Sequence, residues 1–248
     1  MTLSGLLKGV AAGLFVVSLP VLFGTSSLRW LVADTGWYQA GFEKYGVSAR
    51  TGISPAELAR SADQISKYLV FQRERVDDIT VTINGQTQPL FKDRENRHMA
   101  DVKALMGRFY DLQTATGIYA LLYLMISRFW LGQAYWRSIG RGLRWGGALT
   151  LGMFAVVGAL ASANFDEFWT RFHLISFDND LWMLDPTKDN LIMMFPEGFW
   201  YDSVIRFALA TGSQAVAAIA VGFLITRMPP APNYQQMPVN KKLAARGK

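Results

Sequence analysis

Two histidines are the side chains of this chain best suited to proton transfer near neutral pH. His98 and His173 are the only histidines among its 248 residues, and an unperturbed imidazole changes charge close to neutrality. All 19 acidic residues fall within residues 34–111 and 166–202, the two segments that also contain the histidines. We therefore predict that both segments lie on one face of the protein and that an active site forms where they meet.

The composition indicates a protein embedded in a membrane. Hydrophobic residues make up 51% of the chain and charged residues 18%, below the roughly 25% charged residues of soluble proteins. The net charge of +6 comes from Lys and Arg scattered beside apolar runs, which indicates membrane topology and not a nucleic-acid partner. The chain has no cysteine, which excludes disulfides, a thiolate nucleophile and cysteine metal ligands.

Four apolar stretches are long enough to cross a bilayer, because a hydrocarbon core of about 30 Å needs about 20 apolar residues in a helix. The predicted fold class is an all-α polytopic membrane protein with four transmembrane helices and a cap that contains a helix and a β-hairpin. We expect the transmembrane helices at residues 1–33, 111–136, 145–165 and 203–227.

The basic residues predict the orientation of these helices. A connector over residues 137–144 contains Arg137, Arg141 and Arg144 and no acidic residue, and a tail over residues 228–248 is also basic and free of acids. Short connectors rich in Lys and Arg remain in the cytoplasm. We therefore expect both termini to be cytoplasmic, and the segments 34–110 and 166–202 to be extracytoplasmic.

Local patterns predict the elements of the first extracytoplasmic segment. Ser54 followed by Pro55 and Glu57 is typical of a helix start, and we expect a helix to about Val70. Residues 79–91 contain two short alternating stretches separated by Asn-Gly, which predicts a hairpin. Asp93 is then expected to cap a helix through residues 94–110 that leads into the second span.

The second extracytoplasmic segment, residues 166–202, interleaves aromatic and acidic residues. A solvated linker would not need so many aromatic side chains, so we expect interfacial or re-entrant helices here. His173 and Asp178 have the H-x4-D spacing seen in glycerolipid acyltransferases, in which the carboxylate orients the histidine base. An acyl transfer at this face would need a donor that is already in the membrane.

Other chemistries have less support in the sequence. It contains no H-E-x-x-H motif and no local pair of histidines, so we expect no metal site. It also has no G-x-S-x-G motif, which a serine hydrolase of the α/β type would need. The alternative that the two histidines are unrelated loop residues stays open at this point.

Two stretches resemble one known family. Residues 94–103 read Arg-Glu-Asn-Arg-His-Met-Ala-Asp-Val-Lys, and this resembles the R-E…H-M-x-D-V segment of the bacterial integral membrane family that includes the lipoprotein intramolecular transacylases. The second extracytoplasmic segment resembles the same family in several short motifs, as does the layout of four spans. These motifs are Phe172-His173, Phe177-x-Asn179-Asp180-x-Trp182, Leu184-Asp185-Pro186, Leu191-Ile192, Phe195-Pro196 and a final Asp202.

The resemblance implies an activity at the bacterial cell membrane. Such enzymes move an acyl chain from the diacylglyceryl group of a lipoprotein to the α-amino group of its N-terminal cysteine, which gives a lyso-form lipoprotein. No cofactor and no external acyl donor is implied. The expected partners are the diacylglyceryl lipoprotein and membrane lipid, and we expect a monomer.

Each candidate residue then receives an expected role. His173 is the expected general base and His98 its partner, although exchanged roles agree equally well with the sequence. Supporting or orienting roles are expected for Arg94, Asp101, Asp178, Asn179 and Asp180, with Asn179 also a candidate donor to an oxyanion. Substrate contacts are expected from Trp182 and Arg206, the latter through an anionic headgroup.

Two other functions stay open. The protein is alternatively a non-catalytic membrane sensor or assembly factor, which would tolerate replacement of either histidine. It is alternatively a lipid hydrolase at the extracytoplasmic face, in which water replaces the amine and free fatty acid is released.

Overall fold

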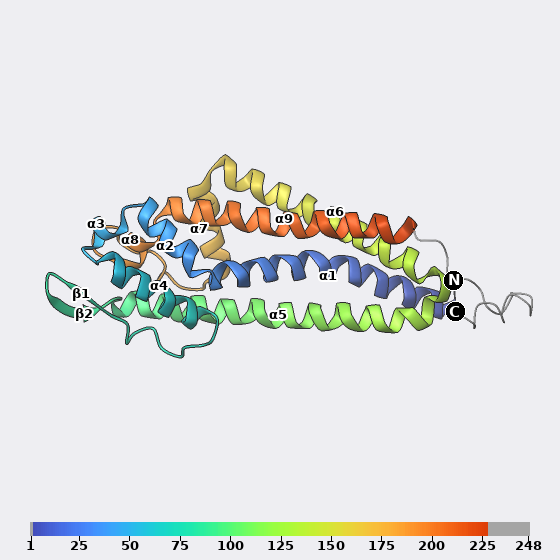
Figure 1. Cartoon of the computed structure of the whole chain (residues 1–248), viewed down its shortest axis with the longest axis horizontal. Helices are drawn as coiled ribbons and strands as arrows, with labels where there is room; N and C mark the ends of the chain where they lie inside the picture. Colours follow the sequence, from blue (N-terminus) through green and yellow to red (C-terminus); the bar gives the residue numbers. More distant parts are fainter. Residues whose placement is uncertain (1, 228–248) are drawn as a thin grey trace, which may run out of the picture.

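The fold is a bundle of four long helices with a cap of short helices and one hairpin at one end. The computed structural model describes residues 2–227. The long helices are α1 (Leu3–Ala33), α5 (Asp93–Leu131), α6 (Tyr135–Ala163) and α9 (Glu197–Arg227). They run side by side along the molecule, and α1 begins at the same end of the bundle at which α9 finishes (Figure 1).

All four long helices are apolar and long enough to span a membrane. The predicted fold class of a four-span, mostly helical membrane protein is therefore confirmed. At 39 residues, α5 is about 58 Å long, nearly twice the roughly 30 Å of a bilayer core. Its apolar part begins after Asp111, so residues 93–110 rise beyond the membrane-spanning part and carry His98 into the cap.

The connections between the spans differ from the predicted boundaries. Residues 137–144 form the first turns of α6 and not a loop, because no residue there stops a helix once it has begun. The chain reverses instead in the short 3-10 turn η1 (Gly132–Ala134), where Gly132 has a φ of +51°. The helix that contains the last predicted span, α9, begins at Glu197, before the predicted start of the span at residue 203. The tail predicted over residues 228–248 lies outside the described residues.

The cap is built from the segments before α5 and after α6. The first supplies α2 (Thr35–Lys44), α3 (Val47–Thr51), α4 (Pro55–Leu69), β1 (Thr80–Ile83) and β2 (Gln86–Pro89). The second supplies α7 (Phe165–Ser176) and α8 (Asn190–Met194). Figure 1 shows α7 lying across the direction of the long helices, next to the cap.

The local predictions for the first cap segment are confirmed at α4 and the hairpin. The Ser54 hydroxyl accepts a hydrogen bond from the Glu57 amide and starts α4. The strands pair in antiparallel register, and Asn84 and Gly85 both have positive φ, as a tight hairpin turn requires. The start of α5 is corrected by one residue, because Lys92 is its N-cap and Asp93 already belongs to the helix.

One apolar core joins the two cap segments. Phe42 of α2, Ile65 of α4 and Met99 of α5 belong to one cluster with Leu191 of α8 and Phe199 of α9. Each of these side chains is at most 8% exposed, so the core excludes water. This core holds the start of α5 against the connection that follows α7, which fixes the relative positions of the two histidines.

Glycines set the close approach of α6 and α9. A Cβ atom on Gly147 would lie 2.7 Å from the backbone oxygen of Ala215, and one on Gly140 would lie 2.7 Å from that of Gly222. Such distances require a shift of the backbone of the neighbouring helix, because backbone atoms cannot move aside as a flexible side chain can. Small residues at a helix interface allow this kind of tight packing in membranes.

We predict that Gly147→Ala destabilises the bundle by about 1–3 kcal/mol, the usual cost of overpacking. The matched control is Gly152→Ala on the same helix, where an added Cβ meets nothing within 4 Å. The control should be neutral or slightly stabilising, because Ala is the better helix former by about 1 kcal/mol. Thermal unfolding of the two purified variants in detergent measures the difference. Equal melting temperatures would contradict the packing described here.

Candidate functional site

The structure brings the two histidines together from different parts of the chain. His98 lies in the second turn of α5 and His173 near the end of α7. Their ring centroids are 6.0 Å apart, and the two residues are only 7% and 8% exposed. A pair of imidazoles at this separation can both contact one substrate group.

A backbone carbonyl assigns the tautomer of His173. The Nδ1 atom of His173 lies 2.8 Å from the carbonyl oxygen of Trp169, one turn earlier on α7. A carbonyl oxygen only accepts hydrogen bonds, so Nδ1 must carry the proton. In the neutral ring the lone pair is then on Nε2, which is the arrangement that a general base needs.

Aromatic rings surround the histidines and hold His173 in place. Trp182 stacks on the His173 ring at 4.7 Å between centroids, and Trp169 meets the same ring edge-on at 4.9 Å. Phe177 lies 5.2 Å from the His98 ring and 5.8 Å from the His173 ring. We call His98, Trp169, His173, Phe177 and Trp182 the histidine cage. Its apolar walls limit the access of water to both imidazoles.

Burial keeps both histidines neutral. It lowers the pKa of His98 to about 4, to which the neighbouring His173 also contributes by disfavouring a second positive charge. Burial lowers the pKa of His173 as well, and the hydrogen bond to Trp169 partly offsets this effect. A neutral imidazole is able to accept a proton, so both rings are in the form required of a base at neutral pH.

The carboxylate predicted to orient His173 does not do so. Asp178 is exposed, and within residues 2–227 no hydrogen bond joins it to either histidine; the Trp169 carbonyl takes the Nδ1 proton instead. The reason is that His173 is still helical, so its ring points back along α7 toward the residue four positions earlier. Asp101 lies one turn after His98, and its charge acts to raise the pKa of that ring.

Four of the predicted supporting residues tie the loop after α7 to α5. The Asn179 amide donates to the Asp101 carboxylate at 2.9 Å. The Arg94 guanidinium donates to the carbonyl of Asp180 and lies 3.6 Å from its carboxylate. Arg94 and Asp101 flank His98 on α5, so these contacts position the loop that carries Trp182 over the histidines.

Arg206 lies outside the histidine cage. Its guanidinium is 2.6 Å from the Asp34 carboxylate, and its centre lies 4.5 Å from the ring of Trp30 and 4.5 Å from that of Trp37. These partners belong to α1, α2 and the junction between them. Of the two predicted substrate contacts, Trp182 therefore lies against His173, whereas Arg206 lies beside Asp34, Trp30 and Trp37.

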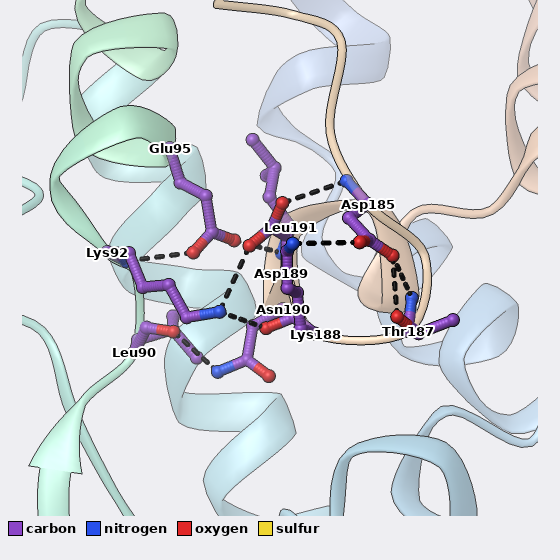
Figure 2. Close-up of polar contacts among 9 residues, drawn as sticks. All are labelled: Leu90, Lys92, Glu95, Asp185, Thr187, Lys188, Asp189, Asn190 and Leu191. Atoms are coloured by element: carbon purple, nitrogen blue, oxygen red, sulfur yellow. Dashed lines mark hydrogen bonds and ion pairs between the residues drawn. The ribbon is translucent and has the colours of Figure 1, made fainter.

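A buried carboxylate that the sequence did not single out anchors the second cap segment. Glu95 is 0% exposed and accepts hydrogen bonds from the backbone amides of Lys92, at 2.8 Å, and Leu191, at 2.6 Å (Figure 2). Burial raises the pKa of this carboxyl group. The position of Glu95 one turn before His98 is the one sequence feature that could have indicated its importance. Its partner Leu191 lies 96 residues later, and no sequence pattern predicts that contact.

The anchor continues into the loop before α8. Lys92 lies 3.0 Å from Asp189, and Asp189 accepts the backbone amide of Asp185 (Figure 2). Asp185 in turn accepts hydrogen bonds from the amide and hydroxyl of Thr187. These bonds lower the pKa of Asp185, so the loop is held by ionised carboxylates. In the described part of the chain no three His, Asp or Glu side chains gather as metal ligands.

Comparison with known proteins was made on both sequence and fold. Residues 13–200 match the family model of the lipoprotein intramolecular transacylase Lit. An uncharacterized protein of Aquifex aeolicus is 27% identical over 134 residues, which cover 54% of this chain. The matched region spans 57% of the length of that relative.

Solved structures with the same fold include the membrane-integral lipoprotein intramolecular transacylase Lit from Bacillus cereus. It superposes with a TM-score of 0.75 at 17% sequence identity, covering 90% of this chain and 97% of that chain. A form of the same protein with a histidine-to-alanine substitution superposes with a TM-score of 0.71. At this level of identity the likeness establishes the fold.

We predict that both imidazoles remain neutral at pH 6.5, the ordinary histidine midpoint, because burial lowers both pKa values. Protonation should appear only as the pH falls further, and that of His98 only at about pH 4. NMR titration of the protein with isotope-labelled histidine measures the two midpoints, and His98→Gln and His173→Gln assign the signals. A midpoint above 6.5 for either ring would contradict the buried, neutral pair.

We also predict that Glu95→Ala strongly destabilises the cap. It leaves the buried amide of Leu191 without an acceptor, at about 1–3 kcal/mol, and also removes the acceptor of the part-buried Lys92 amide. The matched control is Glu167→Ala, since the Glu167 side chain is 52% exposed and its ion pair is with Arg171, one turn away on α7. The control should cost less than about 1 kcal/mol. Chemical denaturation and limited proteolysis of residues 177–196 measure the effect, and equal losses in the two variants would contradict the anchor.

Proposed function

The chain belongs to the lipoprotein intramolecular transacylase family, and from this premise we propose that it converts diacylglyceryl lipoproteins into the lyso form. In the proposed reaction an acyl chain moves from the diacylglyceryl group to the α-amino group of the N-terminal cysteine. The acyl donor and the amine belong to one substrate molecule, so the reaction needs no external acyl donor and no cofactor.

The observation that carries this proposal is the defined tautomer of a buried histidine. Because Nδ1 of His173 donates to the Trp169 carbonyl, its Nε2 is available to take a proton. The α-amino group has an ordinary pKa of about 7.7–8, so it is largely protonated near neutral pH and must lose a proton before it can attack. The lowered pKa of His173 keeps the base in its neutral form.

The proposed step balances without any added reagent. The ammonium form first releases one proton to solvent, which leaves the neutral amine. The amine nitrogen then attacks the ester carbonyl carbon, the new C–N bond forms, and the carbonyl oxygen becomes an oxyanion. His173 takes a proton from the nitrogen and becomes an imidazolium. The oxyanion then collapses, the C–O bond to the glyceryl group breaks, and the imidazolium gives its proton to the departing glyceryl oxygen. The products are an amide and a free hydroxyl group.

The other cage residues receive proposed roles from their positions. His98, whose ring lies 6.0 Å from that of His173, donates a hydrogen bond to the oxyanion or shares the transferred proton. Its Nδ1 is buried and has no hydrogen-bond partner among the described residues, so this nitrogen is not committed to another group of the protein. Asn179 keeps one amide proton for the oxyanion while the other binds Asp101. Exchanged roles for the two histidines remain a permitted variant of this mechanism.

The surroundings of the cage suit a substrate that arrives in the membrane. Leu174 and Ile175 on α7 are 62% and 87% exposed, and Met183 beside Trp182 is 56% exposed. These apolar side chains lie next to His173 in the sequence and offer a surface for acyl chains. We propose that the cage faces the extracytoplasmic side, where mature lipoproteins carry their diacylglyceryl group. Alignment of amine and ester on one residue supplies much of the acceleration as effective molarity.

The decisive experiment is mass spectrometry of a lipoprotein N-terminus from cells that lack their own N-acylating enzyme. The intact chain should give an N-acylated lyso-form product. His98→Ala and His173→Ala should each reduce its formation by at least about 10²-fold, the lower range of acid–base catalysis. The matched control is Arg171→Gln, an exposed residue two positions before His173, which should retain activity.

Two other results would contradict the proposal. An unchanged diacylglyceryl lipoprotein in cells that express the intact chain well would favour a sensor or assembly role. Free fatty acid without an N-acyl product would favour a hydrolase, in which water takes the place of the amine. Full activity in both histidine variants would remove the histidines from the mechanism.

A further inference from the structure

A cavity of about 580 Å³ lies between α2 and α9, apart from the histidine cage. This volume is within the range of small-molecule and cofactor sites. Trp37 and Lys44 line it from α2, and Asp202, Ile205, Arg206 and Leu209 line it from α9. A hydrogen bond of 2.9 Å from the Trp37 indole to Ser203 fixes the two helices to each other, so the cavity has defined walls.

Two cations face this cavity with hydrogen-bonding capacity to spare. Arg206 lies over the rings of Trp30 and Trp37, each at 4.5 Å, which holds its guanidinium in one plane. Within residues 2–227 its guanidinium makes one hydrogen bond, to Asp34, although a guanidinium has five donors. Lys44 pairs with Asp202 at 2.5 Å, and its side chain is 60% exposed. The two cations are thus accessible to an anion.

The carboxylates beside the two cations leave some of their N–H donors free for a further anion. Asp202 also accepts the hydroxyl of Tyr45 at 2.7 Å, so its charge is already shared between two donors. Lys44 pairs with Asp202 and Arg206 with Asp34, so the N–H donors that these two pairs leave unused are what the site offers to an anion. A planar Arg beside a Lys is a favourable arrangement for the oxygens of a phosphate group.

The apolar side of the cavity continues into the transmembrane part of α9. Ile205 and Leu209 lie one helical turn apart on the same face and are 41% and 70% exposed. Residues 207–226 contain no charged side chain, so α9 enters the hydrocarbon core at the level of this cavity. The cavity therefore offers cations at the membrane surface and apolar side chains directly below, which is the polarity of a phospholipid.

We infer that this cavity is a binding site for a membrane glycerophospholipid, with its phosphate against Lys44 and Arg206 and its acyl chains along Ile205 and Leu209. The occupant differs from the acyl donor proposed above, because a diacylglyceryl group has no phosphate. The α-amino group of that donor is moreover a cation, which these two side chains would repel. The site goes beyond the proposed reaction and does not depend on it.

The test is native mass spectrometry of the full chain in detergent with phosphatidylethanolamine or with diacylglycerol of the same chains. The intact protein should retain the phospholipid at least tenfold better than the diacylglycerol. The double variant Lys44→Gln/Arg206→Gln should lose this preference. The matched control is Arg60→Gln/Lys67→Gln, which removes one Arg and one Lys that pair with carboxylates on the exposed face of α4, and it should keep the preference.

Two further variants separate lipid binding from folding and from catalysis. Lys44→Gln alone changes a largely exposed side chain and should weaken phospholipid retention without lowering the melting temperature. His98→Ala should retain the phospholipid as well as the intact protein does, whether or not it is active. Equal retention of the two lipids by the intact protein, full retention by the double variant, or loss in His98→Ala would each overturn the assignment.

Discussion

The buried carboxylate of Glu95 is the constraint on which the histidine cage depends. It accepts one amide from its own helix start and one from Leu191, so α5 and the connection after α7 meet at a fixed position. Burial of a carboxylate lowers the stability of the fold little while both of its hydrogen bonds are made, and lowers it strongly when they are broken. The contacts of Arg94 and Asp101 with the same connection depend on that docking. His173 can therefore meet His98 although 75 residues separate them in the chain.

Neutrality of the two histidines follows from the same docking. The aromatic rings that close over them come from α7 and from the loop that Glu95 and its neighbours hold down. Removing water lowers the pKa of each ring, and a second positive charge beside the first is unfavourable. The pair is consequently expected to carry at most one positive charge at a time, which suits the proposed step in which a single proton is taken up and returned.

Much of the fold follows from local sequence patterns, whereas most of the site does not. Apolar runs predict the four spans because the bilayer imposes a minimum length. Ser54-Pro55 predicts the start of a helix and Asn84-Gly85 predicts a hairpin turn, because a helix cap and a tight turn need those residue types. The H-x4-D spacing misplaced the partner of His173, since a helical residue turns its ring toward the carbonyl four positions earlier. The links from Glu95 to Leu191 and from Arg206 to Asp34 join distant residues, and no spacing rule reports such contacts. Residues 137–144, predicted as a loop, are helical. Arg residues indicate on which side of the membrane a segment lies, but they do not end a helix.

The continuity of α5 links the position of His98 relative to the membrane to the thickness of the bilayer. One unbroken helix connects the turn at Gly132 with His98 near its other end, so a fixed number of residues sets the distance between His98 and the end of the bundle opposite the cap. A loop at Asp111 would let the imidazoles follow the ester group of a lipid as the bilayer thins or thickens, but a helix responds by tilting as a whole. Under the proposed function, bilayer thickness would therefore set the depth of the histidine cage relative to the ester group of the lipid substrate.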